Sequence, residues 1–305
     1  MTDKPLRNVA ASVSQRLTTI SRQTGEDFQF LLTRYCIARL LYRLSQSKYS
    51  RQYILKGAML FSVWGNSPYR PTRDLDLLGR GENSLSHAIK VFRAVCATPV
   101  ENDGVVFDPE TVRAAEIRND LAYGGTRVQL AARLAQARLT LQIDIGYGDA
   151  VTPKPQIVEF PSVLDFPQAR LLAYRPETVV AEKFQAMVAL GIANSRMKDF
   201  YDLWTFAARF QFEGRPLGNA LKATFTRRKT PLPVAMPMAL TEEFHDDRAK
   251  QAQWSAFIRK NRLPSNGLTL AQVAAVLREF LMPPTLAVAG GQPFTKVWLN
   301  GGPWE

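Results

Sequence analysis

The chain has 305 residues, of which 46% are hydrophobic and 22% charged, as is typical of a globular protein with one large domain or two of ordinary size. Lys and Arg exceed Asp and Glu by 39 to 27, and the net charge of +12 favours a polyanionic partner, nucleic acid before a membrane surface. Two cysteines and two histidines are too few for a Cys/His zinc site, and no apolar stretch is long enough to span a membrane, which predicts a cytoplasmic protein whose metals would bind to carboxylates.

The N-terminal part predicts a basic helix and then a second helix that leads into a short strand. Apolar residues recur at helical spacing over residues 28–44, within a segment 1–55 that carries nine Lys or Arg and three Asp or Glu. Its apolar stripe would pack on the core, and its arginine face is either solvated or binds RNA. The second helix is expected to begin near Met59 and end near Gly65, ahead of a strand over residues 74–78.

The rest of the chain divides into an α/β part and a helical part. A helix is expected over residues 84–99, and alternating apolar residues over 126–134 and 139–145 predict an antiparallel hairpin. The apolar spacing is then helical over five segments, residues 178–190, 198–210, 218–225, 242–261 and 270–281. We therefore expect an N-terminal domain over residues 1–165 and a helical domain over residues 166–305.

Three aspartates are candidate metal ligands. Asp74 and Asp76 lie two residues apart on the expected strand, so both carboxylates leave one face while Leu75 and Leu77 enter the core. Asp144 is a lone acid in an otherwise apolar strand. If the two strands are neighbours, the three carboxylates can hold two Mg²⁺ ions, the arrangement that serves phosphoryl transfer. On spacing alone, a solvated strand edge remains the alternative for the Asp-x-Asp pair.

A possible phosphate-binding turn precedes the second helix. Lys56, Gly57 and Ala58 lie just ahead of this helix, whose free N–H groups and dipole would favour a triphosphate. Gly57 has no Cβ, so backbone or ligand can approach it closely. An ordinary turn glycine is the alternative explanation.

Charged residues also interrupt two helices of the C-terminal part. Lys183 lies in a largely apolar helix and could neutralise phosphate charge. Arg196, Asp199 and Asp202 recur at i, i+3 and i+6, so they share a helix face that could orient phosphate or hold a charge network. The alternative for this face is a solvated set of paired charges, for example Lys198 with Asp202.

Five sequence blocks occur in a specific order, namely YILKGAML at 53–60, YRPTRDLDLLG at 69–79, LQIDIGYGD at 141–149, PETVVAEK at 176–183 and NSRMKDFYDL at 194–203. Together they resemble the AbiEii/AbiGii toxin family, which is grouped with the MenT-type nucleotidyltransferases of bacterial toxin–antitoxin and phage-defence systems. The resemblance covers roughly residues 28–210.

The resemblance implies an α+β fold, with a polymerase-β-like nucleotidyltransferase core built on a mixed or antiparallel sheet and a C-terminal helical domain. The nucleotide-binding residues that it implies are Lys56, Gly57, Ala58, Lys183, Arg196, Asp199 and Asp202. The implied ligands of two Mg²⁺ ions are Asp74, Asp76 and Asp144, which with Lys183 form the implied catalytic set. The wider superfamily has Gly-Ser in the turn where this chain has Gly57-Ala58, so backbone amides and Lys56 would have to hold the triphosphate.

The reaction that the resemblance implies is nucleotide transfer from an NTP to RNA, notably a tRNA 3′ end, with release of pyrophosphate. In such systems a cognate antitoxin relieves the resulting block of translation. Two alternatives stay open on the sequence: transfer of the nucleotide to a protein hydroxyl, and a non-catalytic nucleic-acid-binding or partner-binding protein with the same fold.

Overall fold

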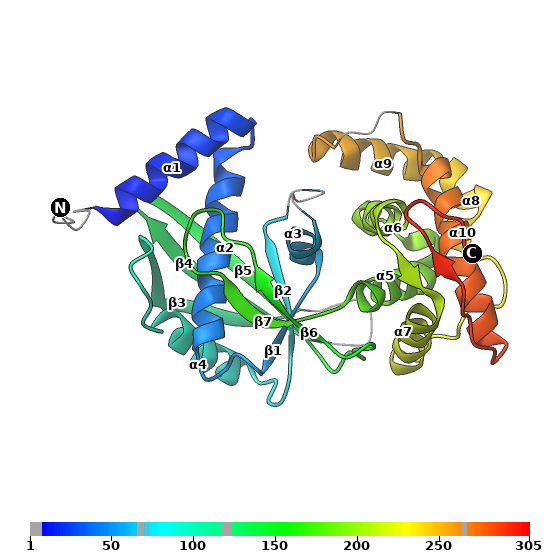
Figure 1. Ribbon diagram of the computed structural model, residues 1–305, viewed down its shortest axis with the longest axis horizontal. Helices are drawn as coiled ribbons and strands as arrows, with labels where there is room; N and C mark the ends of the chain where they lie inside the picture. The colour runs from blue at the N-terminus through cyan, green and yellow to red at the C-terminus, as the bar shows by residue number, and fades with distance from the viewer. Residues whose placement is uncertain (1–7, 66–69, 71, 118–123, 264–266) are drawn as a thin grey trace. The chain divides into compact units, whose positions relative to one another are not determined.

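The computed structural model describes residues 8–65, 70, 72–117, 124–263 and 267–305, and it forms two compact units. The first unit runs to Gly148 and includes Gln156–Ala173, and the second consists of Asp149–Pro155 and Tyr174–Glu305 (Figure 1). The expected boundary at residue 165 falls between two strands that pair in one sheet, β6 (Gln156–Phe160) and β7 (Ala169–Ala173). Because β7 also pairs with β1 (Tyr53–Lys56) of the same sheet, both strands belong to the first unit.

The first unit combines helices with a seven-stranded sheet. Its helices are α1 (Val9–Thr24), α2 (Phe28–Gln46), the 3₁₀ helix η1 (Ala58–Leu60), α3 (Phe61–Trp64) and α4 (Leu85–Cys96). Its other strands are β1 (Tyr53–Lys56), β2 (Asp74–Gly79), β3 (Val105–Ile117), β4 (Gly125–Leu134) and β5 (Ala137–Tyr147). Side-chain caps define where two helices begin, because Asp27 and Ser84 accept backbone N–H bonds from the first turns of α2 and α4.

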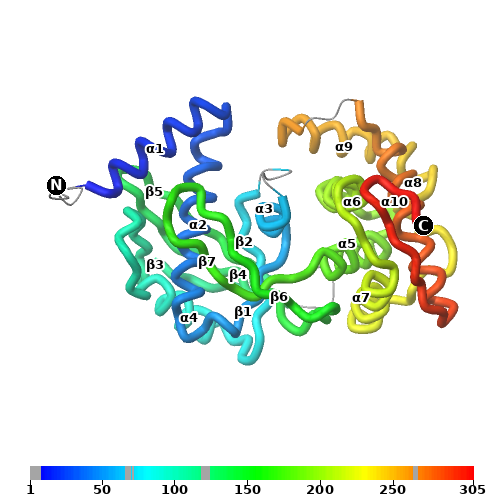
Figure 2. The backbone as a smooth tube through the Cα atoms, viewed as in Figure 1, coloured from blue at the N-terminus to red at the C-terminus, as the bar shows by residue number. Residues whose placement is uncertain are grey.

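The sheet has the strand order β3-β4-β5-β2-β1-β7-β6, with β2 parallel to β5 and antiparallel to β1. Helices α2 and α4 pack against it (Figure 1). The α+β class and the predicted hairpin of β4 and β5 are confirmed. Helix α1, which a sharp turn at Gly25 joins to α2 (Figure 2), and strands β1, β3, β6 and β7 were not predicted.

The second unit is mainly helical, as the sequence predicted. Its helices are α5 (Pro176–Leu190), η2 (Gly191–Ala193), α6 (Met197–Arg209), α7 (Gly214–Arg227), η3 (Met238–Leu240), α8 (Glu242–Asp246), α9 (Arg248–Lys260) and α10 (Leu270–Ala289), and β8 (Phe212–Glu213) pairs with β9 (Val297–Trp298). The helix expected over residues 242–261 is interrupted at Asp247, whose carboxylate caps α9. None of the helices in the described residues has the length and apolarity needed to cross a bilayer.

Helix α10 continues through Pro283 and Pro284, beyond the expected end at residue 281. A proline cannot donate the helical hydrogen bond, so the carbonyl of Phe280, four residues before Pro284, loses its usual partner. The indole N–H of Trp304 donates to this carbonyl at 3.1 Å, because the C-terminal segment returns along α10 (Figure 2). A donor from a distant part of the chain therefore replaces the missing one.

Candidate functional site

The three predicted acids lie on neighbouring strands of the first unit. Strands β2 and β5 are parallel, and their register places Asp76 beside Asp144 and Asp74 beside Gln142. Leu75, between the two acids of β2, is buried, so the acids leave the opposite face of the sheet. The neighbouring strands that the three-carboxylate hypothesis requires are therefore present.

Two basic residues extend this arrangement across the sheet. Lys56 of β1 pairs in register with Asp76, and Arg127 of β4 pairs in register with Asp144. We call Arg127, Asp144, Asp76 and Lys56 the carboxylate row, since they lie side by side on four consecutive strands with two acids between two bases. Neighbouring strands are about 4.8 Å apart, so the two central carboxylates repel each other unless a cation lies close to them.

The turn at Gly57 packs directly on the carboxylate row. Gly57 has a φ of +73°, and a Cβ at this position would lie 2.1 Å from Oδ2 of Asp76. Only glycine fits there, both for its backbone conformation and for the space that the carboxylate fills. Beyond it, Ala58 is buried and starts η1, and η1 and α3 together run from Ala58 to Trp64, close to the helix expected from near Met59 to near Gly65.

Arg127 is the residue of this site that the sequence analysis missed. Its Nε and Nη2 donate to Oδ1 and Oδ2 of Asp144 at 2.9 and 2.8 Å, a bidentate ion pair. The hydrogen bonds that Arg127 donates to Asp144 raise the pKa of Arg127, and the charges of Asp144, Asp74 and Asp76 add to the effect. A signal for Arg127 was present, because the short loop between β4 and β5 sets a register in which it faces Asp144.

The donor set of the site suits Mg²⁺, which prefers carboxylate oxygens. As the side chains stand, however, Asp144 is bound to Arg127. Within the described ranges, no three Asp, Glu, His or Cys side chains are gathered closely enough to hold a metal ion. Coordination by all three aspartates would therefore require Asp144 to leave Arg127.

A second charged cluster lies inside the second unit. Nζ of Lys183 is 2.5 Å from Oδ1 of Asp199 and 2.9 Å from Oδ2 of Asp202, and we call these three residues the lysine cluster. Both aspartates are buried, so they do not lie on a solvated helix face. Arg196 is the residue immediately before α6, and its backbone N–H donates to Asn194. The structure thus brings three of the four predicted residues of this segment into contact.

A network beside the lysine cluster was not predicted from the sequence. Arg228 binds Oδ1 of Asp149 at 3.0 Å and Oε1 of Gln185 at 2.9 Å, and Tyr174 donates to Glu182 at 3.0 Å. Burial lowers the pKa of Arg228, but the carboxylates of Glu182 and Asp149 outweigh this effect and raise it. Because Glu182 precedes Lys183 in α5, the network holds the helix turn that carries the lysine.

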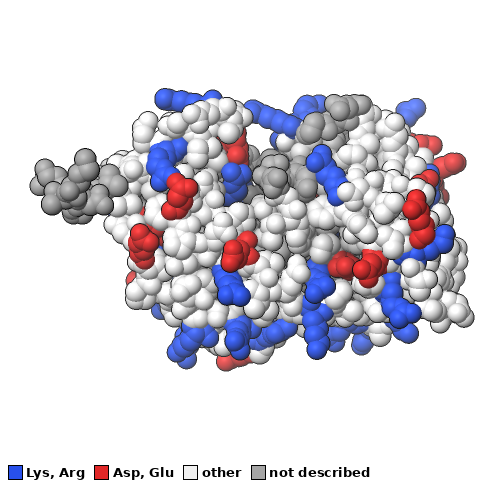
Figure 3. All heavy atoms as spheres, viewed as in Figure 1, with Lys and Arg blue, Asp and Glu red and all other residues white. Residues whose placement is uncertain are grey.

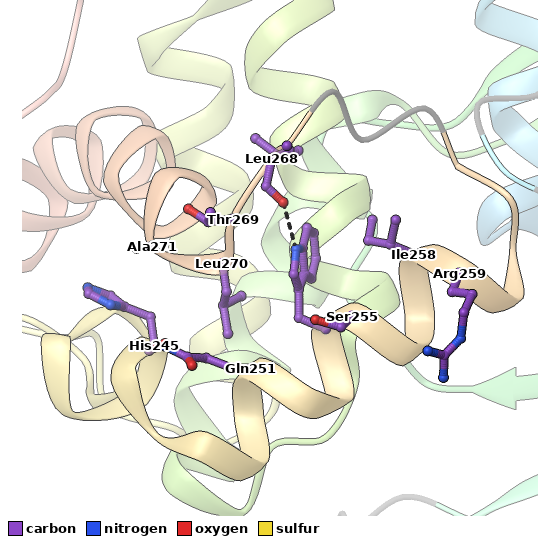
Figure 4. Close-up of a pocket in the computed structure, with 11 residues that line it drawn as sticks. His245, Gln251, Ser255, Ile258, Arg259, Leu268, Thr269, Leu270 and Ala271 are labelled. Atoms are coloured by element: carbon purple, nitrogen blue, oxygen red, sulfur yellow. Dashed lines mark hydrogen bonds between the residues drawn. The ribbon is translucent and has the colours of Figure 1, made fainter.

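A pocket of about 540 Å³ lies in the second unit, between α9 and the chain that leads into α10 (Figure 4). Its walls are partly apolar, and the indole N–H of Trp254 donates to the carbonyl of Leu268 at 2.9 Å on one side of it. None of the candidate site residues lines this pocket.

Comparison with known proteins identifies one family and one fold. The sequence model of the family described as nucleotidyl transferase AbiEii toxin, type IV toxin–antitoxin system, matches residues 39–275. No curated protein sequence matches the chain.

Three solved structures are similar to the chain. JHP933 from Helicobacter pylori has a TM-score of 0.51 at 15% identity, over 87% of this chain and 96% of its own. A putative nucleotidyltransferase from H. pylori has a TM-score of 0.50 at 14% identity, over 88% and 100%. MenT4, a nucleotidyltransferase toxin from Mycobacterium tuberculosis, has a TM-score of 0.49 at 17% identity, over 92% and 98%. At such identities the two H. pylori structures show a shared fold alone.

Proposed function

The chain belongs to the AbiEii nucleotidyltransferase toxin family of type IV toxin–antitoxin systems, and from this premise we propose that it transfers a nucleotide from an NTP to RNA, at a tRNA 3′ end, with release of pyrophosphate. Membership of this family implies a cognate antitoxin. The reaction would take place in the cytoplasm, where NTPs and tRNA occur together.

The observation that carries this proposal is the register of β2 and β5. It places the carboxylates of Asp76 and Asp144 side by side, with Asp74 on the same face. Acids on two adjacent strands, with a third on the same face, form a donor set that suits Mg²⁺ next to a turn packed by Gly57, which is the arrangement that nucleotidyl transfer needs.

In this proposal Asp74, Asp76 and Asp144 hold two Mg²⁺ ions. Bound there, Mg²⁺ would supply charge stabilisation for the phosphates and lower the pKa of the attacking hydroxyl. Lys56 and the backbone N–H groups of Gly57 and Ala58 bind the triphosphate. Asp144, the acid on the separate strand, accepts the proton of the attacking hydroxyl at its carboxylate.

The proposal assigns a phosphate role to the second unit as well. Lys183 contacts the triphosphate, and Asp199 and Asp202 orient its ammonium group by the two ion pairs of the lysine cluster. Arg196, next to the start of α6, offers a further cation for phosphate. These roles predict that substitutions in the cluster change nucleotide affinity as well as stability.

Surface charge supports RNA as the acceptor. With a net charge of +12, the protein attracts polyanions. Lys and Arg side chains are spread over much of the face in Figure 3 and are not confined to one patch. The net charge, and not a patch on this face, is therefore what favours a polyanionic acceptor.

The test is transfer of label from each α-labelled NTP in the presence of Mg²⁺, total tRNA and a cell lysate. We expect label in tRNA, lost when the tRNA 3′ end is oxidised beforehand and lost when Mg²⁺ is chelated. Asp76→Asn should abolish it, whereas Glu116→Gln, an exposed acid on β3 of the same sheet, should not. Label found in protein alone would contradict an RNA acceptor, and no label in any fraction would contradict transfer altogether.

A further inference from the structure

Arg127 binds the carboxylate of Asp144, which a divalent cation at this site would also need as a ligand. Both oxygens of Asp144 accept hydrogen bonds from this one guanidinium, so the carboxylate has its strongest acceptor directions filled. Asp144 is also the only acid that β5 contributes to the carboxylate row. A cation shared between β2 and β5 therefore competes with Arg127 for the same carboxylate.

The ion pair is built so that it can open. The side chain of Arg127 is 41% exposed, so solvent can receive the guanidinium without the desolvation penalty of a buried charge. Gln142 provides a second partner when its amide group is turned by 180°, because its oxygen then lies 3.3 and 3.2 Å from Nε and Nη2 of Arg127 and can accept from both. The guanidinium can leave Asp144 and remain at the site.

Charge balance gives a reason for the exchange. Without metal, the two bases of the carboxylate row offset its two acids, and Asp74 adds one further negative charge on the same face. Entry of a divalent cation makes the neighbourhood positive, which repels Arg127 from Asp144. A planar guanidinium released at such a site is well suited to phosphate oxygens.

Resting on the proposed function, we propose that Arg127 exchanges partners: it is the counter-ion of Asp144 in the metal-free protein, a divalent cation displaces it, and the displaced guanidinium then binds a phosphate of the incoming NTP. Arg127 is thus a regulator of metal affinity as well as a substrate contact. Both parts can be measured without turnover.

The first measurement is Mn²⁺ binding to the full-length protein without nucleotide, by electron paramagnetic resonance. If the ion pair is formed about 90% of the time, Arg127→Gln should tighten Mn²⁺ binding about tenfold, because a competitor has been removed. Arg133→Gln is the matched control, since Arg133 is exposed on the same strand and face, opposite Arg138, away from the acids. Unchanged or weaker Mn²⁺ binding in Arg127→Gln would overturn the proposal.

A double-mutant cycle separates direct competition from the general field of one positive charge. In an Asp144→Asn background the effect of Arg127→Gln should fall to that of Arg133→Gln, because the shared carboxylate is gone. A tenfold gain that persists in this background would contradict competition for Asp144. Arg127→Lys, which keeps the charge and loses the bidentate fork, should lie between wild type and Arg127→Gln and guards against a folding defect of the glutamine variant.

The second measurement is binding of a non-hydrolysable NTP analogue with Mg²⁺ present. Here Arg127→Gln should weaken binding about tenfold, the opposite direction from Mn²⁺ alone. A variant that was simply misfolded would weaken both. Equal analogue affinity would overturn the phosphate contact.

The binding measurements and the transfer assay distinguish failure of the exchange from failure of the proposed reaction. If wild type transferred no nucleotide but Arg127→Gln showed both binding effects, the proposed reaction would fail and the exchange would stand. Transfer by wild type with neither binding effect in Arg127→Gln would support the reaction and contradict the exchange.

Discussion

The two charged centres of the molecule differ in how far water reaches them. In the carboxylate row the ion-paired side chains of Arg127 and Asp144 are 41% and 22% exposed. In the lysine cluster the side chains of Lys183, Asp199 and Asp202 are 13%, 7% and 1% exposed. The first centre can exchange ions with solvent, whereas the second holds charges that are stable only while all of them remain in place.

This difference predicts which property each centre controls. An exposed ion pair contributes little to folding, so the carboxylate row can be tuned for ligands at small cost in stability. Removal of one partner from a buried pair leaves an uncompensated charge and destabilises the fold strongly. Substitutions in the carboxylate row should therefore lower activity at little cost in stability, whereas those in the lysine cluster should lower stability as well as nucleotide affinity.

The largest expected effect is that of Lys183→Met, which keeps the length of the side chain and removes its charge. Asp199 and Asp202 would then face each other as buried acids without the lysine, so we expect the free energy of unfolding to fall by about 3–5 kcal/mol. Urea denaturation followed by tryptophan fluorescence would measure it. Lys198→Met, an exposed lysine on the same helix as the two aspartates, should stay within about 0.5 kcal/mol of wild type, and an equally small effect for Lys183→Met would show that the cluster is not a stability element.

The next effect is on activity. Asp76→Asn should lower nucleotide transfer at least about a hundredfold, because a neutral amide cannot hold a cation for the phosphates. Stability should change by less than about 1 kcal/mol, since the substitution relieves repulsion from Asp144. A rate assay and a urea titration on the same sample make the comparison, and a large loss of stability would place Asp76 with the buried centre instead.

The hydrogen bond from Trp304 to Phe280 tests whether a buried carbonyl in the second unit needs a replacement for its missing helical donor. Trp304→Phe removes the indole N–H that serves the carbonyl of Phe280, and we expect a loss of about 1–3 kcal/mol in unfolding free energy because that carbonyl stays buried. Pro284→Ala restores a backbone donor in α10. The loss should therefore shrink when Trp304→Phe is made in the Pro284→Ala background, and an unchanged loss would assign the effect to packing of the indole.

Local patterns in the sequence predicted the elements that have their own periodicity. Alternation predicted the hairpin of β4 and β5, and helical spacing predicted α2 and α4–α6 to within a few residues. Strand β1 was not predicted, because its four residues are all partly or fully buried and show no alternation of apolar and polar side chains. Helix α10 was predicted too short, because the bond that carries it past Pro284 comes from Trp304, far along the chain.

The acids of the candidate site could be predicted from the sequence, but the ion pairs that compensate their charges could not. Spacing placed Asp74 and Asp76 on one face, yet only the parallel register of β2 and β5 brings Asp144 beside them. The pairing of Arg127 with Asp144 depends on a different register, that of the β4–β5 hairpin. The lysine cluster depends on how α5 and α6 pack, so helix periodicity alone left a phosphate-orienting face, a charge network and a solvated face as alternatives, and the structure buries Asp199 and Asp202.

The smallest expected effect concerns a half-buried acid, Glu177, that, unlike the acids of the lysine cluster, has one buried oxygen without a partner in the described part of the chain. Oε2 of Glu177, in the first turn of α5, has no hydrogen-bond partner among the described residues, and burial raises the pKa of this carboxyl above its ordinary value of 4.5. A raised pKa means that the folded state favours the protonated form, so the contribution of this group to stability is present below pH 4.5 and is lost as the pH rises through the folded-state pKa.

Glu177→Gln imitates the protonated form at every pH. Its urea midpoint should exceed that of wild type at pH 7, where the wild-type carboxylate is ionised and desolvated, and the difference should close as the pH falls towards 4.5. The exposed Glu279→Gln on α10 serves as the control and should show no such trend. A variant less stable than wild type at pH 7 would mean that the ionised Glu177 stabilises the start of α5 through the helix dipole more than burial destabilises it.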